Sequence, residues 1–392
     1  MKIFNKNEWK KVKLGDIFNL QMGKTPLREN KLYWNKGEYN WISISDMNFS
    51  EKYVSFTKEK ITNLAVKESG IKIIPKNTVI MSFKLSIGKV KIVNDDIYSN
   101  EAIMAFIPKE NIPIDKNFLY YSLKSIKWNE GINKAVKGLT LNKALISQKE
   151  IFLPNLAIQK EIASNLDSIA DFLDLRRKQL NYLKELNKSL FTTMFGDPLL
   201  NDKKEWNFFK IKDIGKIISG STPSTNISEY WNGEYLWITP AELNDDSFII
   251  NSTNRKLTYL GVKTSSLIEL PIGTVLLSSR APIGKVAIVG ENMFCNQGFK
   301  NIIPNEKINS IYLYYVFKEK KEYLNFLGRG ATFKELSKEI VENISIKVPP
   351  IELQNKFAER IEKIEKLKFE IEKSIEMAQN LYNSLISKYF DN

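Results

Sequence analysis

The sequence predicts two similar mixed α/β (α+β) domains in tandem duplication, joined by a long antiparallel two-helix coiled coil. Three observations support this fold class: an internal repeat of about 195 residues, a heptad pattern in each repeat, and β-rich runs before each heptad segment. The expected domains are 1–155 and 199–351, and the expected long helices are 156–198 and 352–392.

The repeat consists of short motifs that recur at a nearly constant offset. Those that recur after 197 residues are Gly23-Lys24-Thr25-Pro26 with Gly220-Ser221-Thr222-Pro223, and Tyr33-Trp34-Asn35 with Tyr230-Trp231-Asn232. Those that recur after 196 residues are Trp41-Ile42 with Trp237-Ile238, and Ile87-Gly88-Lys89-Val90 with Ile283-Gly284-Lys285-Val286. Because several motifs match at one offset, we infer an internal duplication.

Each copy is expected to be a globular domain followed by a long helix. The pattern predicts strands at 274–279 and 285–289 and helices at 115–128 and 308–326. A last strand, at 151–154 and at 344–349, is stopped by proline, and Gly196-Asp197-Pro198 should end the first long helix.

The two long helices are expected to pack on each other, because apolar residues recur in each at alternating intervals of three and four. The predicted seam consists of Ile162, Leu166, Ile169, Leu173, Leu180, Leu183, Leu190 and Met194 in the first helix, and of Phe357, Ile361, Ile364, Ile371, Ile375, Ala378, Tyr382, Leu385 and Tyr389 in the second. Arg176 and Asn187 interrupt the first line, and Lys368 interrupts the second.

The order of domains and helices along the chain predicts that the two long helices are antiparallel. The ends of a compact domain usually lie close together, so the second helix should begin near the end of the first and return along it. The expected shape is a dumbbell with a pseudo-two-fold axis, in which Arg176 and Asn187 face Ile371, Tyr382 or Lys368, depending on register. The alternative is a plain tandem duplication whose helices pack on their own domains, but strict heptad spacing favours the coiled coil.

Composition restricts the function classes. The 392 residues are 43% hydrophobic and 26% charged, typical of a globular protein, and no apolar run approaches the roughly 18 residues of a membrane helix. The absence of histidine excludes Ser-His and Cys-His nucleophile pairs. The single cysteine, Cys295, excludes an internal disulfide and a thiolate zinc cluster and is expected to be a small buried residue. We expect a cytoplasmic protein without a secretory signal.

The net charge of +13 favours a polyanionic partner and is unevenly distributed. Residues 1–157 carry +11 and residues 198–352 carry +2, whereas the helical segments 158–197 and 353–392 are neutral. Phosphate binding is therefore not expected to be the main task of the helices. The alternative explanation is a lysine-rich solvated surface without a specific partner.

Three enzyme motifs are incomplete. Gly23-Lys24-Thr25 lacks the upstream glycine of a nucleotide-binding P-loop, because Phe18 stands in its place. The run 326–330 reads as the F-x-G-x-G of adenine methyltransferases but follows a helical pattern, and the matching Pro-Pro-aromatic motif is missing. Asp115-Lys116 is only a fragment of a nuclease pattern. We therefore expect no catalytic residue and no metal site in this chain.

The remaining candidates are basic, hydroxyl, amide and glycine residues in the loops of both repeats. Lysines, hydroxyls and glycine N–H groups suit phosphate contacts, and Arg, Asn and Gln can bond base edges. Each alone is more typical of a solvated turn, but their repetition predicts a DNA-facing surface. The candidates are Lys24, Thr25, Arg28, Lys84, Ser86, Lys89, Lys137, Gly138, Thr140, Lys143, Ser221, Thr222, Ser279, Arg280, Lys285, Asn296, Gln297, Lys300, Arg329, Gly330, Thr332 and Lys334. Tyr33-Trp34 and Tyr230-Trp231 could stack on bases, but a structural aromatic pair is favoured.

Together these motifs resemble the specificity subunit of type I restriction–modification systems over nearly the whole chain. The resemblance is carried by the Gly-x-Thr-Pro and Tyr-Trp-Asn motifs and by the runs 278–285, Asn296-Gln297-Gly298, 328–332 and Phe195-Gly196-Asp197-Pro198. The first repeat departs from the pattern, because Ser82-Phe83-Lys84-Leu85-Ser86 replaces Ser-Ser-Arg-Ala-Pro and Asn100-Glu101-Ala102 replaces Asn-Gln-Gly. The departures fit two domains that read different sequences.

The resemblance implies a DNA-recognition subunit without catalysis of its own. Each target-recognition domain would read one half of a bipartite double-stranded DNA site, and the coiled coil would set the spacer. Two methyltransferase subunits would dock on this chain and restriction/motor subunits would join them. S-adenosylmethionine, ATP and Mg²⁺ would bind in those partners. The alternatives are a non-catalytic scaffold that spaces two protein-binding modules and a single-chain DNA methyltransferase or nuclease.

Overall fold

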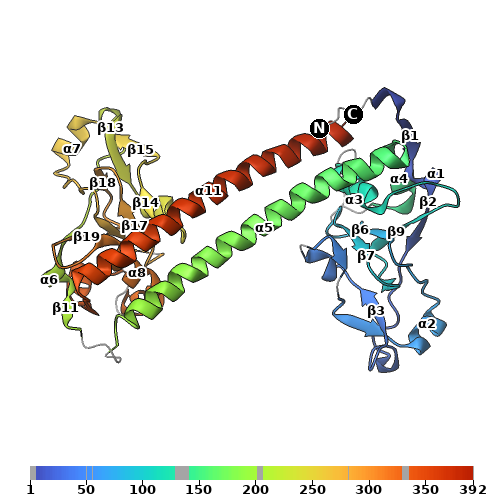
Figure 1. Ribbon diagram of the computed structural model, residues 1–392, viewed down its shortest axis with the longest axis horizontal. Coiled ribbons are helices and arrows are strands. Elements are labelled where there is room, and N and C mark those ends of the chain that lie inside the picture. Colours follow the sequence, from blue (N-terminus) through green and yellow to red (C-terminus); the bar gives the residue numbers. More distant parts are fainter. Residues whose placement is uncertain are drawn as a thin grey trace. The chain divides into compact units, whose positions relative to one another are not determined.

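The computed structural model describes residues 6–49, 51–54, 56–128, 141–200, 206–280, 282–328 and 335–391. Contacts within the chain divide it into two compact units: 1–176 with 374–392, and 177–373. Each unit contains one globular domain and a part of each long helix, α5 (Leu156–Phe195) and α11 (Ile351–Phe390) (Figure 1).

The first unit contains a five-stranded and a three-stranded sheet. The larger sheet has the order β2 (Phe18–Met22), β9 (Ile103–Pro108), β6 (Val79–Ser82), β7 (Val90–Val93) and β4 (Tyr53–Val54). The smaller has the order β5 (Glu59–Ile61), β3 (Tyr39–Ile42) and β8 (Tyr98–Ser99). Neighbouring strands are antiparallel except for the parallel pairs β4–β7 and β3–β8. A separate antiparallel pair joins β1 (Lys10–Lys13) to β10 (Glu150–Leu153), the strand that leads into α5.

The first domain also contains α-helices. They are α1 (Leu14–Ile17), α2 (Asn63–Ser69), α3 (Lys116–Ser125) and α4 (Lys143–Gln148). The central strands β6 and β7 are buried along their whole length, and Phe118 and Leu123 of α3 join the same core. Asp115 begins α3, because its carboxylate accepts hydrogen bonds from the N–H groups of residues 117 and 118 at 2.9 Å.

The second unit repeats this topology. Its larger sheet has the order β12 (Gly215–Ile218), β19 (Asn301–Pro304), β16 (Val275–Leu277), β17 (Val286–Val289) and β14 (Ile249–Ile250). Its smaller sheet has the order β15 (Arg255–Leu257), β13 (Trp231–Ile238) and β18 (Met293–Cys295), and β11 (Phe208–Lys210) pairs with β20 (Ser345–Lys347). Its helices are α6 (Ile211–Ile214), α7 (Tyr259–Thr264), α8 (Ser310–Glu319), α9 (Lys321–Leu327) and α10 (Lys338–Asn343). The same strand order in both units confirms the internal duplication.

The predicted local elements are confirmed with one correction. β16 and β17 lie within the predicted strands, and Gly196, with φ +71°, follows the last residue of α5. The helix predicted over 308–326 is instead two helices, α8 and α9. Lys320 separates them with the non-helical φ of −108°, and its ammonium binds Asp197 at 2.5 Å.

In the first unit the start of α5 packs against the end of α11, and Figure 1 shows these two ends side by side. Ile162 and Leu166 are buried together with Leu385 and Tyr389 in the core that also contains the first domain's sheet. The order of these contacts makes the pair antiparallel. The seam is therefore continuous with the core, and the helices are part of the domain rather than an appendage.

In the second unit the end of α5 packs against the start of α11. Phe191 and Phe195 lie against Phe357, with ring centroids 5.7 and 5.1 Å apart, in the core of the second domain. All residues of the predicted seam are buried or partly buried within their units. Within the described part of the chain, every helix is too short or too polar to traverse a lipid bilayer.

Of the three residues predicted to face Asn187, Lys368 lies near it, since both donate to one carboxylate that the sequence analysis did not name. The amide of Asn187 donates to Glu365 Oε1 at 2.8 Å, and the ammonium of Lys368 binds both oxygens of the same carboxylate at 2.9 and 2.8 Å. Heptad spacing gave only the seam positions, whereas a buried amide and a buried ammonium require a hydrogen-bonding partner. Glu365, beside the seam, supplies it. Arg176 lies over the ring of Phe172, 5.0 Å from its centre.

Candidate nucleic-acid interface

In the first repeat the Gly-x-Thr-Pro loop is fixed to β8 and β3. The N–H of Lys24 donates to the Ser99 carbonyl at 2.8 Å, and the indole N–H of Trp41 donates to the Lys24 carbonyl at 3.1 Å. A Cβ on Gly23 would lie 2.0 Å from the Ser99 carbonyl oxygen, so the loop can approach the strand only with glycine there. Thr25, which follows Lys24, is therefore held in a fixed position.

The second repeat has the same arrangement. The N–H of Ser221 donates to the Cys295 carbonyl at 3.0 Å, and the indole N–H of Trp237 donates to the Ser221 carbonyl at 3.1 Å. A Cβ on Gly220 would lie 1.9 Å from the Cys295 carbonyl oxygen. The equivalent of Thr25, Thr222, is thus fixed by the same three contacts.

An asparagine orders the turn after β8 and the turn after β18. The N–H of Asn100 and that of Asn296 each donate at 3.1 Å to the carbonyl that ends β3 or β13. Their side-chain oxygens accept from the N–H of Ala102 at 3.1 Å and of Gly298 at 3.0 Å. The side-chain oxygen of Asn296, which the sequence offered as a base contact, is therefore engaged in the turn.

The threonine of each loop holds the side chain that follows this asparagine. Thr25 Oγ1 donates to Glu101 Oε2 at 2.5 Å, and Thr222 Oγ1 donates to Gln297 Oε1 at 2.6 Å. Glu101 and Gln297 are both exposed. Partial burial would raise the pKa of Glu101, but the hydrogen bond from Thr25 and the charges of Lys84 and Arg28 outweigh it and lower that pKa. The carboxylate therefore stays ionised.

A guanidinium is stacked on the tryptophan pair of the first repeat. Arg28 lies 3.9 Å from the ring centre of Trp34 and 4.7 Å from that of Trp41, and its Nη2 binds Glu59 Oε2 at 3.1 Å. The indole of Trp34 donates to the carbonyl of Leu27 at 3.2 Å. Arg28, predicted to contact DNA, thus already has an acidic partner and two aromatic ones.

In the second repeat the guanidinium on the tryptophan pair comes from a different segment of the chain than in the first. Arg255, on β15, lies 3.5 Å from the ring centre of Trp231 and 5.1 Å from that of Trp237. The indole of Trp231 donates to the carbonyl of Ser224 at 3.1 Å. The structural role predicted for the Tyr-Trp motif is confirmed for its tryptophans, since Trp34 and Trp231 bind the loop and pack edge-on against Trp41 and Trp237.

The loop between β6 and β7 carries three predicted residues of the first repeat. The hydroxyl of Ser82 donates to the carbonyl of Ser86 and accepts from the N–H of Lys89 at 3.1 Å. The ammonium of Lys89 binds the side chain of Asn48. Lys84, 5.5 Å from the ring centre of Phe83, is partly exposed at the tip. Because the charge of Lys84 lowers the pKa of Glu101, the loop presents Lys84 near the Thr25–Glu101 pair.

The equivalent loop between β16 and β17 has the same hydrogen bonds. The hydroxyl of Ser278 donates to the Pro282 carbonyl at 2.8 Å and accepts from the N–H of Lys285 at 2.8 Å. The ammonium of Lys285 binds the carbonyls of Pro240, at 3.2 Å, and Leu243. Lys285 thus binds the chain before β14 in the way that Lys89 does in the first repeat.

Two predicted contact residues of the second repeat are inside the domain. Ser279 is fully buried and Lys300 is 8% exposed, with its ammonium 3.4 Å from Glu335 Oε1. Arg280 Nε binds the other carboxylate oxygen of Glu335 at 3.1 Å. Burial would raise the pKa of Glu335, but Arg280 and Lys300 lower it. As placed, Ser279 and Lys300 support the loop, and Glu335 is a residue that the sequence prediction missed.

Within each domain the structure thus brings three loops together. In the first domain these loops begin at residues 23, 84 and 100, and in the second domain their counterparts come together in the same way. Lys143 begins α4, two residues after Leu141, whose N–H donates to the Phe83 carbonyl at 3.1 Å. The remaining predicted residues lie outside the described residues: Lys137, Gly138, Thr140, Arg329, Gly330, Thr332 and Lys334. Glu101 was also missed, although its counterpart Gln297 was predicted.

Cys295 has the buried role that the sequence predicted. Burial raises the pKa of its thiol to about 12, and the amide of Asn301 lies 3.0 Å from its sulfur. It is therefore a neutral packing residue rather than a nucleophile. Among the described residues, no three Asp, Glu or Cys side chains gather in a way that could hold a metal ion.

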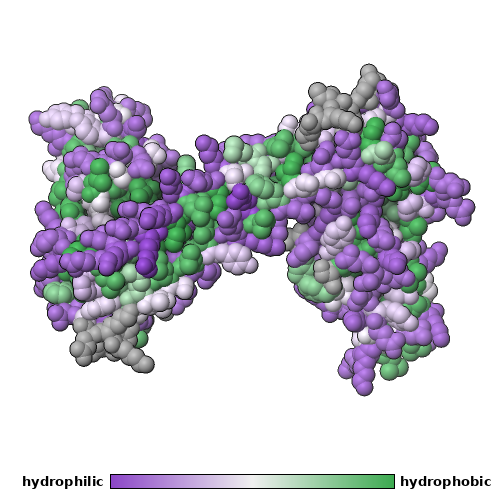
Figure 2. Space-filling model, viewed as in Figure 1, coloured by the Kyte–Doolittle hydropathy of each residue, from purple (hydrophilic) through white to green (hydrophobic). Residues whose placement is uncertain are grey.

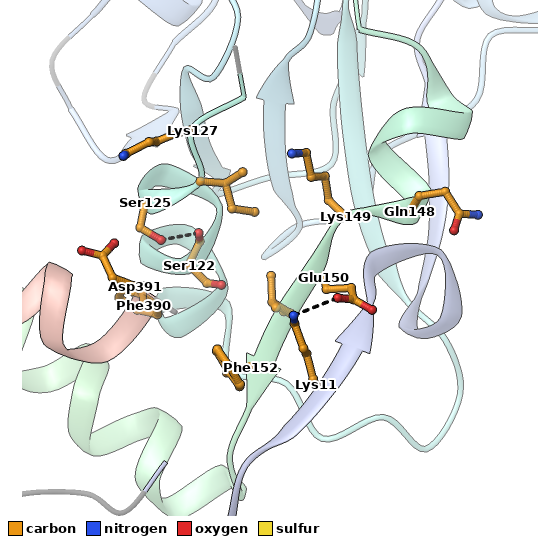
Figure 3. A pocket seen from close by; sticks show the side chains of 12 residues that line it. Lys11, Ser122, Ser125, Lys127, Gln148, Lys149, Glu150, Phe152, Phe390 and Asp391 are labelled. Carbon is orange, nitrogen blue, oxygen red and sulfur yellow. Dashed lines mark hydrogen bonds and ion pairs between the residues drawn. The ribbon is translucent and has the colours of Figure 1, made fainter. Parts of the chain in front are cut away.

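A separate cavity of about 450 Å³ lies in the first unit, beside the β1–β10 pair and the end of α11 (Figure 3). Its lining includes Lys149 and the side chains of Lys11 and Glu150, which form an ion pair at 3.1 Å. Ser125 Oγ donates to the carbonyl of Ser122. Since no residue of the loop cluster lines it, the cavity is not an extension of that cluster.

Comparison with known proteins identifies the family. The family model described as the type I restriction modification DNA specificity domain matches twice, over residues 6–185 and 203–378. The chain therefore belongs to this family and contains two copies of its domain.

Individual relatives agree with this assignment. The type I restriction enzyme MjaIX specificity subunit of Methanocaldococcus jannaschii is 43% identical over 190 residues, which cover 48% of this chain and 44% of that protein. The type I restriction–modification S subunit of M. genitalium superposes over 100% of this chain and 98% of its own, with a TM-score of 0.66 and 15% identity. A structure of a type I restriction–modification system, solved to explain complex assembly, has a TM-score of 0.60 at 16% identity and covers 97% of both chains.

Proposed function

We propose that this chain is the DNA sequence-recognition subunit of a type I restriction–modification complex and that each domain reads one half of a bipartite double-stranded site. The observation that carries the proposal is the duplicated loop cluster. The same glycine, threonine and tryptophan contacts fix the loops in both domains, while exposed side chains such as Glu101 and Gln297 differ. Loops with the same backbone contacts but different exposed side chains suit two domains that read different bases.

Charge supports DNA as the ligand. The excess of +11 over residues 1–157 and +2 over 198–352 lies in the parts of the chain that hold the loops. Lysines near a phosphate backbone release counterions, which provides affinity without sequence preference. The exposed amide and carboxylate groups can then provide the preference. Catalysis is assigned to partner subunits, which would also hold S-adenosylmethionine, ATP and Mg²⁺, and we expect the complex to work in the cytoplasm.

The two long helices are proposed to set the length of the unread spacer. Each has 40 residues, and a helix of that length extends about 60 Å at about 1.5 Å per residue. The segments 158–197 and 353–392, which contain almost all of both helices, are neutral, so phosphate binding is not their main task. The seam residues near the ends of the helices are part of the domain cores, which attaches these ends firmly to the domains.

Docking of methyltransferase subunits is supported by a second apolar stripe on each helix. If the seam residues are labelled a and d of the heptad, exposed apolar residues recur at c and g. In the first unit these are Phe172 and Leu175 of α5, with Met377 and Leu381 of α11. Because g positions of antiparallel partners flank the same side of the seam, the four residues form one face.

The second unit has its own version of this face. Tyr182 and Leu186 of α5 and Leu367 of α11 are exposed at c and g positions, and each lies 195 residues from an exposed apolar counterpart in the first unit. Figure 2 shows hydrophobic residues exposed on the surface along the long helices. Apolar faces of this kind mark interaction sites. Their occurrence twice matches two copies of one partner, the methyltransferase subunit, with restriction/motor subunits joining that core.

Reconstitution with the methyltransferase subunit of the same system tests the proposal. The complex should methylate a duplex pool only at a motif of two short half-sites separated by a spacer of constant length. Equal binding of all duplexes at moderate salt would refute sequence recognition. Failure to bind any DNA, alone or in the complex and at every salt concentration, would favour a protein scaffold instead.

A further inference from the structure

We propose that Glu101 and Gln297 read one base each, with opposite hydrogen-bonding polarity. Glu101 accepts a hydrogen bond from the exocyclic amino group of cytosine or adenine, and Gln297 donates one to an acceptor atom of its base. This inference rests on the proposed function and names one specificity-determining residue in each domain.

The two residues occupy equivalent, rigid positions. Each follows the asparagine that orders its turn, and each accepts a hydrogen bond from the hydroxyl of the Gly-x-Thr-Pro threonine, at 2.5 Å in Glu101 and 2.6 Å in Gln297. The threonine is itself fixed by its glycine, by a backbone hydrogen bond and by a tryptophan. A side chain held in this way loses little additional freedom when it binds, which favours discrimination over general adhesion.

The atoms that remain available differ between the two sites. In the first domain the threonine uses Oε2 of Glu101, so the outward group, Oε1, can only accept. In the second domain the threonine uses Oε1 of Gln297, so the outward group is the Nε2 amide, which can only donate. The same framework therefore presents an acceptor in one domain and a donor in the other.

The major groove contains partners for both groups. Cytosine N4 and adenine N6 are donors, whereas guanine O6 and N7, adenine N7 and thymine O4 are acceptors. A phosphate is a poor partner for Glu101, because two anions repel each other, so a carboxylate at this place on a DNA-binding surface suits a base amino group. Lys84 and Arg28 stabilise its charge, which keeps it an acceptor at neutral pH.

The test compares methylation motifs of matched variants. Each reconstituted complex methylates a duplex pool with randomised half-sites, and sequencing reports the motif. Glu101→Gln should change one position of one half-site from cytosine or adenine toward guanine or thymine, which offer acceptors but no amino group in the major groove, by about tenfold in relative rate. Gln297→Glu should make the reverse change in the other half-site. Thr25→Val, which releases Glu101, should broaden the same position that Glu101→Gln alters.

Glu110→Gln is the control, because it removes an exposed charge of the same domain outside the loop cluster. It should leave the motif unchanged. If the Glu101 and Gln297 variants methylate normally and keep the wild-type motif, or alter the same half-site, the inference is overturned while the proposed function stands. If the wild-type complex itself has no bipartite motif, the proposed function fails, and this inference with it.

Discussion

The Gly-x-Thr-Pro loop binds the turn behind it in the same way in both domains, yet the side chain that its threonine holds is a carboxylate in the first and an amide in the second. The guanidinium on the tryptophan pair differs too, since Arg28 comes from the loop and Arg255 from β15. The contacts that position the loops are thus repeated, and the groups that they present have diverged.

The halves of the helix pair differ in the same manner. In the second unit two seam residues, Asn187 and Lys368, form a polar group with Glu365, which lies beside the seam. The positions 195 residues away hold Tyr382, Ala170 and Leu173, so the first unit has no such group. There a polar group lies beside the seam instead, where Asp167 binds Lys52 at 2.5 Å. The repeat therefore fixes the geometry of the seam but not its chemistry.

The largest effect is expected from the part of the framework that both repeats share. Leu166 and Ile361 are equivalent seam residues, and both are fully buried. Leu166→Ala and Ile361→Ala should each lower the free energy of unfolding by about 3 kcal/mol, because each leaves a cavity in a domain core. Thermal unfolding should show similar losses, with the exposed Lys160→Ala as control. A loss in only one of the two variants would show that the frameworks are not equivalent.

A slightly smaller effect is expected where the seams differ. Glu365→Leu leaves Lys368 buried without its counter-ion and should cost about 3 kcal/mol or somewhat less, since the pair retains some solvent contact. The triple variant Asn187→Leu, Glu365→Leu, Lys368→Met should recover most of that loss, because apolar residues pack well in a heptad seam. Denaturant unfolding compares the two variants, and a triple variant as unstable as the single one would contradict this account.

A charge placed in one of the two apolar faces should weaken the binding of one methyltransferase subunit only. Leu381→Glu places a charge in the apolar face of the first unit, and Leu186→Glu does so in the second. Each should weaken binding of one methyltransferase subunit by about 2 kcal/mol, or about 30-fold, and leave the other unaffected. Native mass spectrometry should then show one bound subunit instead of two. Lys366→Glu, at the outer f position, is the control, and loss of both subunits in either Leu variant would argue against separate faces.

The smallest effect separates two lysines of the loop cluster. Lys84 is partly exposed, whereas the ammonium of Lys285 binds backbone carbonyls of its own domain. Lys84→Gln should reduce the slope of log affinity against log salt by about 1, and Lys285→Gln should leave it nearly unchanged. Fluorescence anisotropy with a duplex at several salt concentrations measures both slopes. An equal reduction in the two would show that Lys285 also contacts phosphate.

Much of the fold could be predicted because it rests on local spacing. The three-and-four intervals identified residues of both long helices that are buried or partly buried, but they missed Phe191 and Phe195, which pack on Phe357. The break between α8 and α9 was missed, since Lys320 leaves the helix where it binds Asp197, a residue 123 positions away. Contacts at such separations have no local pattern.

The candidate site was predicted in outline but not in its polar partners. Chemical type identified Thr25, Thr222 and Gln297, but Glu101 was passed over because acids are unexpected on a DNA-facing surface. Its relation to Thr25, 76 residues earlier, appears only after folding. Ser279 and Lys300 were chosen for the same chemical reasons and are buried, because their loop turns them toward Glu335.

The most direct test of the central claim is the spacer length of the methylated motif after both helices are shortened together. Deleting 173–179 and 368–374 removes one equivalent heptad from each helix and keeps the seam in register. Seven residues correspond to about 10 Å of helix, or about 3 base pairs. The shortened protein should direct methylation at the wild-type half-sites with a spacer shorter by about that amount. Unchanged half-sites with an unchanged spacer would contradict the claim that the helices set the spacer.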